Sequence, residues 1–240
     1  MVGGLSLKPK IVQLASARVA QAFEREAELI KQVQGGALEQ CLLLWRPAGQ
    51  TLVLPASRSW QALPELVSQL ESSGWDMLSR RTGGAPVPQH AGVINVSHIY
   101  VWKGQEEYST RLGYEDLCRP LAMFFESFGV PVAAHATPFS YCDGDYNLNV
   151  AGQKVVGTAQ RVMLKSGGEK IVLAQACIVV DADLDELIAP VNVCNELNGK
   201  TERVRAEAHT CLSRHVADLP ATPVLFQRLI QSFGACQRSL

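Results

Sequence analysis

The sequence of 240 residues contains no long hydrophobic run, and this absence excludes a broad class of proteins. No stretch reaches the length of about 18 apolar residues that a membrane-spanning helix requires. The opening segment, residues 1–10, has too short an apolar run for a secretory signal. We therefore expect neither membrane insertion nor secretion, and we predict a cytoplasmic protein.

Paired cysteines and metal-binding histidine patterns are also missing. The seven cysteines are scattered without a C-x-x-C pair, and the five histidines show no metal-ligand spacing with a carboxylate or a cysteine. An odd, scattered set of cysteines is typical of a reducing compartment. The sequence therefore predicts a reducing environment and no metal site.

Neither sign of charge is in excess. Lysine and arginine together number 22, aspartate and glutamate 23, and the formal net charge is -1 at pH 7. This balance argues against broad attachment to nucleic acid or anionic membrane, because both attract strongly basic surfaces. The chain also lacks internal repeats, low-complexity tracts and linkers. We expect a single domain over residues 1–240, without nucleic-acid or membrane partners.

Hydrophobic residues make up 47% of the sequence, which is enough for one sizeable core. Apolar residues recur at helical spacing from Val12 to Val33, so we expect one long first helix there, ending near Gly35. Other apolar patterns predict helices at 60–70, 114–128, 184–197 and 222–233, and strands at 41–46, 51–54, 155–164 and 170–180. Mixed elements of this kind predict an α/β domain.

One segment, residues 140–154, combines a thiol and an amine. Apolar residues alternate with asparagines over 147–150, as in a half-buried strand, and Ala151-Gly152 supplies a tight turn into the next strand. Cys142 would then lie in the loop before a hairpin that carries Lys154. A thiol nucleophile and an amine that polarises a carbonyl suit acyl transfer. The alternative is structural, because most free cysteines are small buried apolar residues and most lysines are solvated.

A second segment, Arg80-Arg81-Thr82-Gly83-Gly84, brings two arginines to two glycines. Without side chains, Gly83 and Gly84 let backbone amides approach a ligand. The loop could hold an acyl carbonyl or a nucleotide phosphate, or form a simple turn. His90 follows closely enough to act as a base on a bound ligand, whereas His98 is the weaker candidate. A lone histidine is more often a surface or hydrogen-bonded residue.

Four polar residues interrupt two otherwise apolar strands: Asn95, Ser97, Thr158 and Gln160. Their alternation could turn them toward one pocket. Because buried polar groups need partners, they could instead tie strands and loops together. Gly157 and Ala159 would leave a surface of small residues on the neighbouring face.

These segments resemble the lipoate-protein ligase and octanoyltransferase family. The run at 146–161, Tyr-Asn-Leu-Asn-Val-Ala-Gly-Gln-Lys-Val-Val-Gly-Thr-Ala-Gln-Arg, is similar to the family's lysine motif, and residues 80–84 resemble its glycine-rich motif, in the family's order. Residues 43–46 and 92–97 resemble its early strand and the strand after the glycine loop, so the similarity covers roughly residues 11–195. Ser140-Tyr141-Cys142 followed by Asp-Gly-Asp-Tyr is most similar to members that use a cysteine as acyl acceptor.

The resemblance implies the biotin/lipoate protein ligase fold, with a central mostly antiparallel or mixed sheet flanked by helices. It implies transfer of an octanoyl or lipoyl group through a Cys142 thioester to a lysine of a lipoyl domain. The donor would be an acyl carrier protein or an acylated lipoyl domain, and no cofactor is expected. Lys154 would hydrogen-bond the acyl carbonyl. The other predicted acyl-binding residues are Arg80, Arg81, Gly83, Gly84, Asn95, Gly157, Thr158 and Ala159.

Two other functions stay open. An ATP-dependent lipoate-protein ligase would use Lys154 to hold an acyl-adenylate, with ATP and magnesium, and Cys142 would only pack. Here the third glycine of the ligase pattern is Ala85, and the aromatic-His-Asp ending is replaced by Pro88-Gln89-His90, which argues against adenylate binding more than against acyl binding. The other function is a lipoyl-domain or acyl-binding module without turnover, against which the intact Cys142 and Lys154 argue.

Overall fold

The computed structural model describes residues 9–103, 106–165 and 167–236. Its helices and strands are, in chain order, β1 (Lys10–Ala17), α1 (Val19–Gln34), β2 (Gln40–Pro47), β3 (Thr51–Leu54), α2 (Pro64–Ser72), β4 (Asp76–Ser79), β5 (Val87–Gln89), β6 (Val93–Val101), α3 (Thr110–Glu126), β7 (Ala133–Ala134), β8 (Leu148–Val150), β9 (Gln153–Leu164), β10 (Lys170–Val179), α4 (Leu184–Leu197) and α5 (Thr222–Cys236). The ends of the expected domain, residues 1–8 and 237–240, lie outside the described residues.

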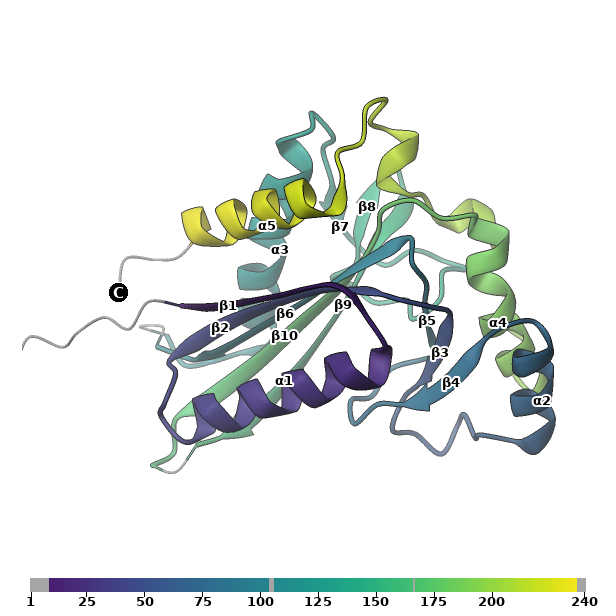
Figure 1. Ribbon diagram of the computed structural model, residues 1–240, viewed down its shortest axis with the longest axis horizontal. Helices are drawn as coiled ribbons and strands as arrows, with labels where there is room; N and C mark the ends of the chain where they lie inside the picture. Colours follow the sequence, from purple (N-terminus) through teal and green to yellow (C-terminus); the bar gives the residue numbers. More distant parts are fainter. Residues whose placement is uncertain (1–8, 104–105, 166, 237–240) are drawn as a thin grey trace, which may run out of the picture.

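A mixed sheet of seven strands forms the centre of the molecule (Figure 1), in the order β1-β2-β6-β10-β9-β8-β7. β1 runs parallel to β2, and the other neighbouring strands pair antiparallel. A smaller sheet has the order β4-β3-β5, with β3 parallel to β4 and antiparallel to β5. This arrangement confirms the predicted mixed sheet flanked by helices.

Helices cover both faces of the large sheet. Figure 1 shows α1 along one face and α3 and α5 along the other. In β2, Leu43 and Trp45 pack under α1, whereas Leu42 and Leu44 belong to the apolar cluster that contains α3 and α5. Burial on both sides explains why this strand reads as an unbroken apolar run rather than as an alternating one.

The small sheet packs beside one end of the large sheet, and this contact positions the site. One apolar cluster contains Leu52 and Leu54 from β3 together with Cys177 and Val179 from β10. Helices α2 and α4 contribute to the same cluster and cover the small sheet. The space between the two sheets therefore lies next to the strands β6, β9 and β10.

The predicted first helix is wrong in its first part. Residues Lys10–Ala17 form strand β1, and α1 begins only at Val19. Val12 and Ala15 fit a helical spacing, but solvent exposure from Lys10 to Gln13 alternates as in a strand. Pairing with β2, such as Ile11 opposite Leu42, decides between the two patterns. Local periodicity cannot reveal this partner, because it lies about 30 residues further along the chain.

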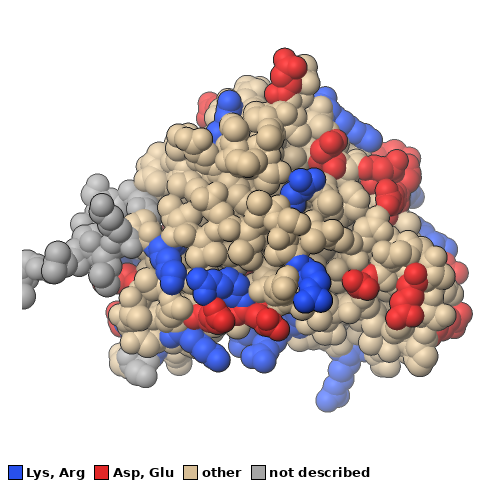
Figure 2. All heavy atoms as spheres, in the orientation of Figure 1, with Lys and Arg blue, Asp and Glu red and all other residues tan. Residues whose placement is uncertain are grey.

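Charged side chains of both signs are interspersed on the face shown in Figure 2, with uncharged surface between them. No strongly basic patch gathers on this face. Within the described residues, no helix has the length and apolar character needed to cross a bilayer. The same residues contain no cluster of three or more histidine, cysteine or acidic side chains placed to hold a metal ion.

Candidate active site

The β8–β9 hairpin brings Cys142 and Lys154 together. Its turn at Ala151 and Gly152 has φ values of 48° and 84°, the left-handed pair that suits a two-residue hairpin. The Lys154 ammonium donates hydrogen bonds to the backbone oxygens of Tyr141 and Cys142, the second at 3.1 Å. Lys154 is fully buried, so it is not a solvated surface charge.

The surroundings of Lys154 favour a reactive or hydrogen-bonding amine. Burial lowers its pKa to about 8, while the thiols of Cys142 and Cys177 and the Asp143 carboxylate act in the opposite direction. The ammonium also lies 4.5 Å from the centroid of the Tyr141 ring. An ammonium carries three N–H donors, and the two backbone oxygens occupy two of them. One donor is therefore left for a further acceptor in the pocket.

Cys142 is held in an uncommon backbone conformation. Its φ of 48° lies in the left-handed region, which costs energy for a residue other than glycine. The Cys142 carbonyl accepts from Lys154 and also from Nδ2 of Asn147, at 3.1 Å. The Asn147 Oδ1 atom in turn accepts from the backbone N–H of Thr158 at 3.1 Å. Asn147 therefore ties the Cys142 loop to β9, a role that the sequence analysis missed.

The glycine loop packs directly against Cys142. The Arg80 guanidinium donates to the backbone oxygens of Val53, Gly83 and Ala85, at 3.3, 2.8 and 2.9 Å. Burial lowers the pKa of this guanidinium, and the nearby Cys142 thiol opposes the effect. A Cβ atom at Gly84 would lie 3.1 Å from the Cys142 sulfur. The loop thus positions a cation and unhindered backbone beside the thiol.

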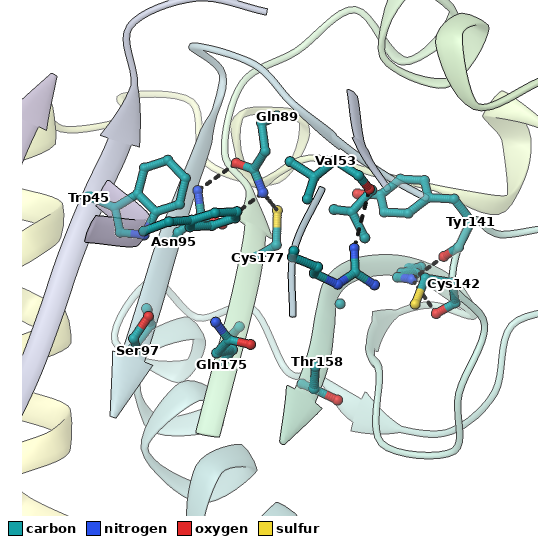
Figure 3. A pocket seen from close by; sticks show the side chains of 18 residues that line it. Trp45, Val53, Gln89, Asn95, Ser97, Tyr141, Cys142, Thr158, Gln175 and Cys177 are labelled. Carbon is teal, nitrogen blue, oxygen red and sulfur yellow. Dashed lines mark hydrogen bonds between the residues drawn. The ribbon is translucent and has the colours of Figure 1, made fainter. Parts of the chain in front are cut away.

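A pocket between the two sheets contains these groups (Figure 3). Its lining residues come from both sheets, α1 and the Cys142 loop, and they are Phe23, Trp45, Val53, Arg80, Val87, Gln89, Asn95, Val96, Ser97, Tyr141, Cys142, Lys154, Gly157, Thr158, Ala159, Gln175, Ala176 and Cys177. Seven of the ten predicted site residues line this pocket directly. Gly84 lies beside the site, because a Cβ atom at this position would be 3.1 Å from the Cys142 sulfur.

The remaining candidates lie elsewhere. Arg81 is exposed, and neither Arg81 nor Gly83 lines the pocket. His90 accepts a hydrogen bond from the nearby backbone N–H of Gly92, also outside the pocket. His98 stacks on Tyr100 in the core, and burial lowers its pKa to about 4. Gln160 bonds to Tyr108 and to the Thr110 backbone rather than to a pocket residue. These four side chains therefore have structural or surface environments.

A buried histidine packs against the Cys142 loop, although no sequence pattern predicted this role. The His209 ring stacks on Tyr141, with 4.8 Å between the centroids. Nδ1 of His209 donates to the Arg205 oxygen at 2.9 Å, so its Nε2 is free to accept from the Tyr141 N–H at 3.3 Å. Burial, assisted by nearby Lys154 and opposed by the hydrogen bond to the Arg205 oxygen, lowers the His209 pKa to about 4. His209 is therefore a neutral packing partner at physiological pH.

The pocket contains a second thiol with a different environment. Cys177 is buried, and burial raises its pKa to about 12. The Gln89 amide approaches its sulfur at 3.9 Å. A thiol with such a pKa stays protonated and is a poor nucleophile near neutral pH. Cys142, which is partly exposed, is the better placed thiol for attack on a substrate.

Comparison with known proteins relates the chain, rather than its individual site residues, to a family. Residues 18–234 match the family model described as the lipoyl protein ligase A/B catalytic domain. An octanoyl-[GcvH]:protein N-octanoyltransferase of Macrococcus caseolyticus is 35% identical over 99 residues, which cover 41% of this chain and 35% of the relative. The corresponding Geobacillus kaustophilus protein is 28% identical over 141 residues, which cover 59% of this chain and 50% of the relative. The chain thus matches between a third and a half of the length of these curated relatives.

The fold also has solved counterparts. A T. acidophilum protein described as a lipoate protein ligase, with bound lipoic acid, superposes with a TM-score of 0.68 at 14% sequence identity. The match covers 95% of this chain and 85% of that protein. At this identity the likeness establishes the fold alone, whereas the family model covers nearly the whole sequence. The chain belongs to the lipoyl protein ligase A/B catalytic domain family.

Proposed function

We propose that this chain is an acyltransferase that moves an octanoyl or lipoyl group through a Cys142 thioester to a lysine of a lipoyl domain. The observation that carries the proposal is the partly exposed Cys142 thiol at a pocket that also contains the buried Lys154 ammonium and the Arg80 guanidinium. Relatives named octanoyl-[GcvH]:protein N-octanoyltransferases support the same reaction class.

In the first half-reaction, the Cys142 thiolate attacks the acyl carbonyl carbon of the donor. The donor is an acyl carrier protein thioester or an acylated lipoyl domain. A carbon–sulfur bond forms to Cys142, the donor's own carbon–sulfur or carbon–nitrogen bond breaks, and the leaving thiolate or amine nitrogen takes up a proton from solvent. Negative charge develops on the carbonyl oxygen, and the third N–H of Lys154 is available to stabilise it.

In the second half-reaction, the deprotonated amine of the acceptor lysine attacks the Cys142 thioester. The carbon–nitrogen bond forms, the carbon–sulfur bond breaks, and the Cys142 thiolate is regenerated. The proton of the attacking amine passes to solvent. The acyl group arrives already bonded to its carrier and is exchanged between carriers, so the proposed reaction consumes no nucleotide and needs no cofactor.

The test is acylation of a purified lipoyl domain under two conditions. One reaction contains an octanoyl carrier-protein donor without nucleotide, and the other contains free octanoate with ATP and magnesium. We expect product in the first alone, together with an octanoyl adduct on the chain in intact-mass measurements. Product in the second alone would identify an ATP-dependent ligase, and product in neither would indicate a binding module or a donor other than the carrier protein.

Two cysteine variants make this test specific. Cys142→Ser should lose both the adduct and the transfer, because a serine hydroxyl is a much weaker nucleophile than a thiol. Cys177→Ser is the matched control, because it removes the other thiol of the same pocket. It should keep the adduct. Full transfer by Cys142→Ser would overturn the thioester mechanism.

A further inference from the structure

The floor of the pocket crosses the large sheet in a straight row. The row consists of four cross-strand neighbours that all line the pocket: Gly157 on β9, Cys177 on β10, Asn95 on β6 and Trp45 on β2. Neighbouring strands lie about 4.8 Å apart, so this row is about 14 Å long. Cys142 lies beside β9. If an acyl chain on its sulfur extends along this row, the far end of the chain lies over β6.

At the level of β6, the pocket is polar where an alkyl chain would require apolar walls. Gln89 and Asn95 exchange hydrogen bonds of 3.1 and 2.7 Å between their side-chain amides. Both residues are buried, at 5% and 6% exposure. Each amide nitrogen carries two N–H donors. Gln89 uses both, on Asn95 Oδ1 and on the Cys177 sulfur, whereas Asn95 uses one on Gln89 and keeps the other for a ligand.

A second polar group lies two residues further along the same strands. Ser97 Oγ and Gln175 Nε2 both donate to Oε2 of Glu26 on α1, at 2.5 and 2.8 Å. Ser97 and Gln175 are direct cross-strand neighbours, and both line the pocket. Burial raises the pKa of the Glu26 carboxyl, and its two hydrogen bonds oppose this effect.

The Tyr141 hydroxyl gives an independent sign of a missing polar partner. Tyr141 lines the pocket and is only 2% exposed. Its hydroxyl has no hydrogen-bond partner among the described residues. Buried polar atoms are nearly always paired in folded proteins, and an unpaired one costs about 1–3 kcal/mol. A ligand with a polar group could satisfy it, and a plain hydrocarbon could not.

We propose that this pocket prefers a medium-length acyl chain with a hydroxyl or another hydrogen-bonding group toward its far end over the plain alkyl chain of the same length. The methylene groups contact the apolar lining residues Phe23, Trp45, Val53 and Val87. The amide and hydroxyl side chains of the lining form hydrogen bonds with the polar end of the acyl chain. This substrate preference rests on the proposed acyl-transfer function, because it describes the acyl group that Cys142 would carry.

The preference can be measured by binding alone, without any acyl transfer. We compare octanoic acid with 8-hydroxyoctanoic acid by titration calorimetry on the intact protein at neutral pH. An apolar pocket would bind octanoic acid more tightly, because the hydroxyl loses its water without gaining a partner. We expect the opposite order, with 8-hydroxyoctanoic acid about tenfold tighter, as one additional net hydrogen bond would give.

A double variant locates the preference. Gln89→Leu combined with Asn95→Leu should reverse it, since both substitutions replace the polar pair at the level of β6 with apolar atoms. Gln160→Leu is the control, because Gln160 lies on neighbouring β9 but outside the pocket; it should leave the preference unchanged. If the double variant does not fold, the comparison on the parent protein decides the question.

Octanoic acid binding as tightly as the hydroxylated acid, or binding of neither, would overturn the inference. These outcomes are distinct from failure of the proposed function. Loss of transfer to the lipoyl domain would appear in the transfer assay, while the calorimetric order of the two acids would still report on the pocket.

Discussion

Lys154 combines full burial with a position beside a thiol, and neither property follows from its residue type. Its pKa of about 8 lies below the ordinary value of 10.5 because burial disfavours the charged form. The ammonium therefore loses its proton as the pH rises through about 8. Its sequence neighbours suggest only the start of a strand, and it is the fold that encloses the side chain.

We predict that Lys154→Ala lowers the rate of octanoyl transfer about 100- to 1000-fold, the usual loss when one preorganised donor to developing charge is removed. Lys154→Arg should not restore the rate, because a planar guanidinium cannot replace a compact ammonium between two carbonyls. Single-turnover acylation of Cys142 is the measurement. A near-parental rate in Lys154→Ala would exclude Lys154 from the chemistry.

The two glycines of the glycine loop have different surroundings, and this difference gives a matched pair of variants. Gly84 has a φ of 103°, and a Cβ atom there would lie 3.0 Å from the Arg80 guanidinium and 3.1 Å from the Cys142 sulfur. No atom lies within 4 Å of the corresponding position at Gly83.

We predict that Gly84→Ala slows acylation of Cys142 at least about tenfold, because the methyl group must displace the thiol or the guanidinium and the backbone is strained. Gly83→Ala should stay close to the parent. The measurement is the rate of adduct formation by mass spectrometry, with circular dichroism to verify folding. Equal rates for the two variants would show that the loop does not position Cys142.

At the scale of elements, the hairpin and the loop before it act as one unit. Asn147 joins the Cys142 carbonyl to the Thr158 N–H, whereas Asn149, two residues later, bonds to the His135 carbonyl and to Thr137. Both asparagines are buried. The sequence showed both as polar positions in an alternating strand and could not assign their partners.

We predict that Asn147→Ala and Asn149→Ala each lower the free energy of unfolding by about 1–3 kcal/mol, because buried partners lose their hydrogen bonds. Only Asn147→Ala should also reduce the rate constant for Cys142 acylation at saturating donor, since it removes one of the two donors that hold the Cys142 carbonyl. Urea unfolding and single-turnover kinetics separate the two effects. An equal kinetic loss in both variants would assign Asn147 a merely structural role.

The sequence predicted most elements but misplaced those whose structure depends on distant partners. Thr51–Leu54 and Leu184–Leu197 form where the local pattern indicated them. Lys10–Ala17 became a strand because β2 pairs with it. The predicted helix at 60–70 begins only at Pro64, where proline is favoured in a first helical turn.

At the scale of the whole molecule, the site depends on contacts that no local motif encodes. Gln175 meets Glu26 across 149 residues of sequence, and Tyr141 meets His209 across 68. The sequence therefore identified the thiol, the amine and the glycine loop, whose motifs are local. It missed Glu26, Gln89 and His209, because isolated polar residues in helices, short strands and loops carry no signal until the chain has folded.

The shared apolar cluster between the two sheets predicts that they unfold together. Leu52 of β3 packs in one cluster with Val93 of β6 and Val179 of β10, so separating the sheets would expose apolar surface of both. Trp45 reports on the large sheet and Trp75 on the small-sheet side, and both are buried. The test uses two variants, each of which retains one of these tryptophans and has phenylalanine at the other three tryptophan positions. We predict that, in each variant, the urea midpoint measured by fluorescence coincides with the midpoint measured by circular dichroism. A Trp75 signal that changes at clearly lower urea than the circular dichroism of the same variant would show that the small sheet unfolds alone, and the pocket between the sheets would then open before the core does.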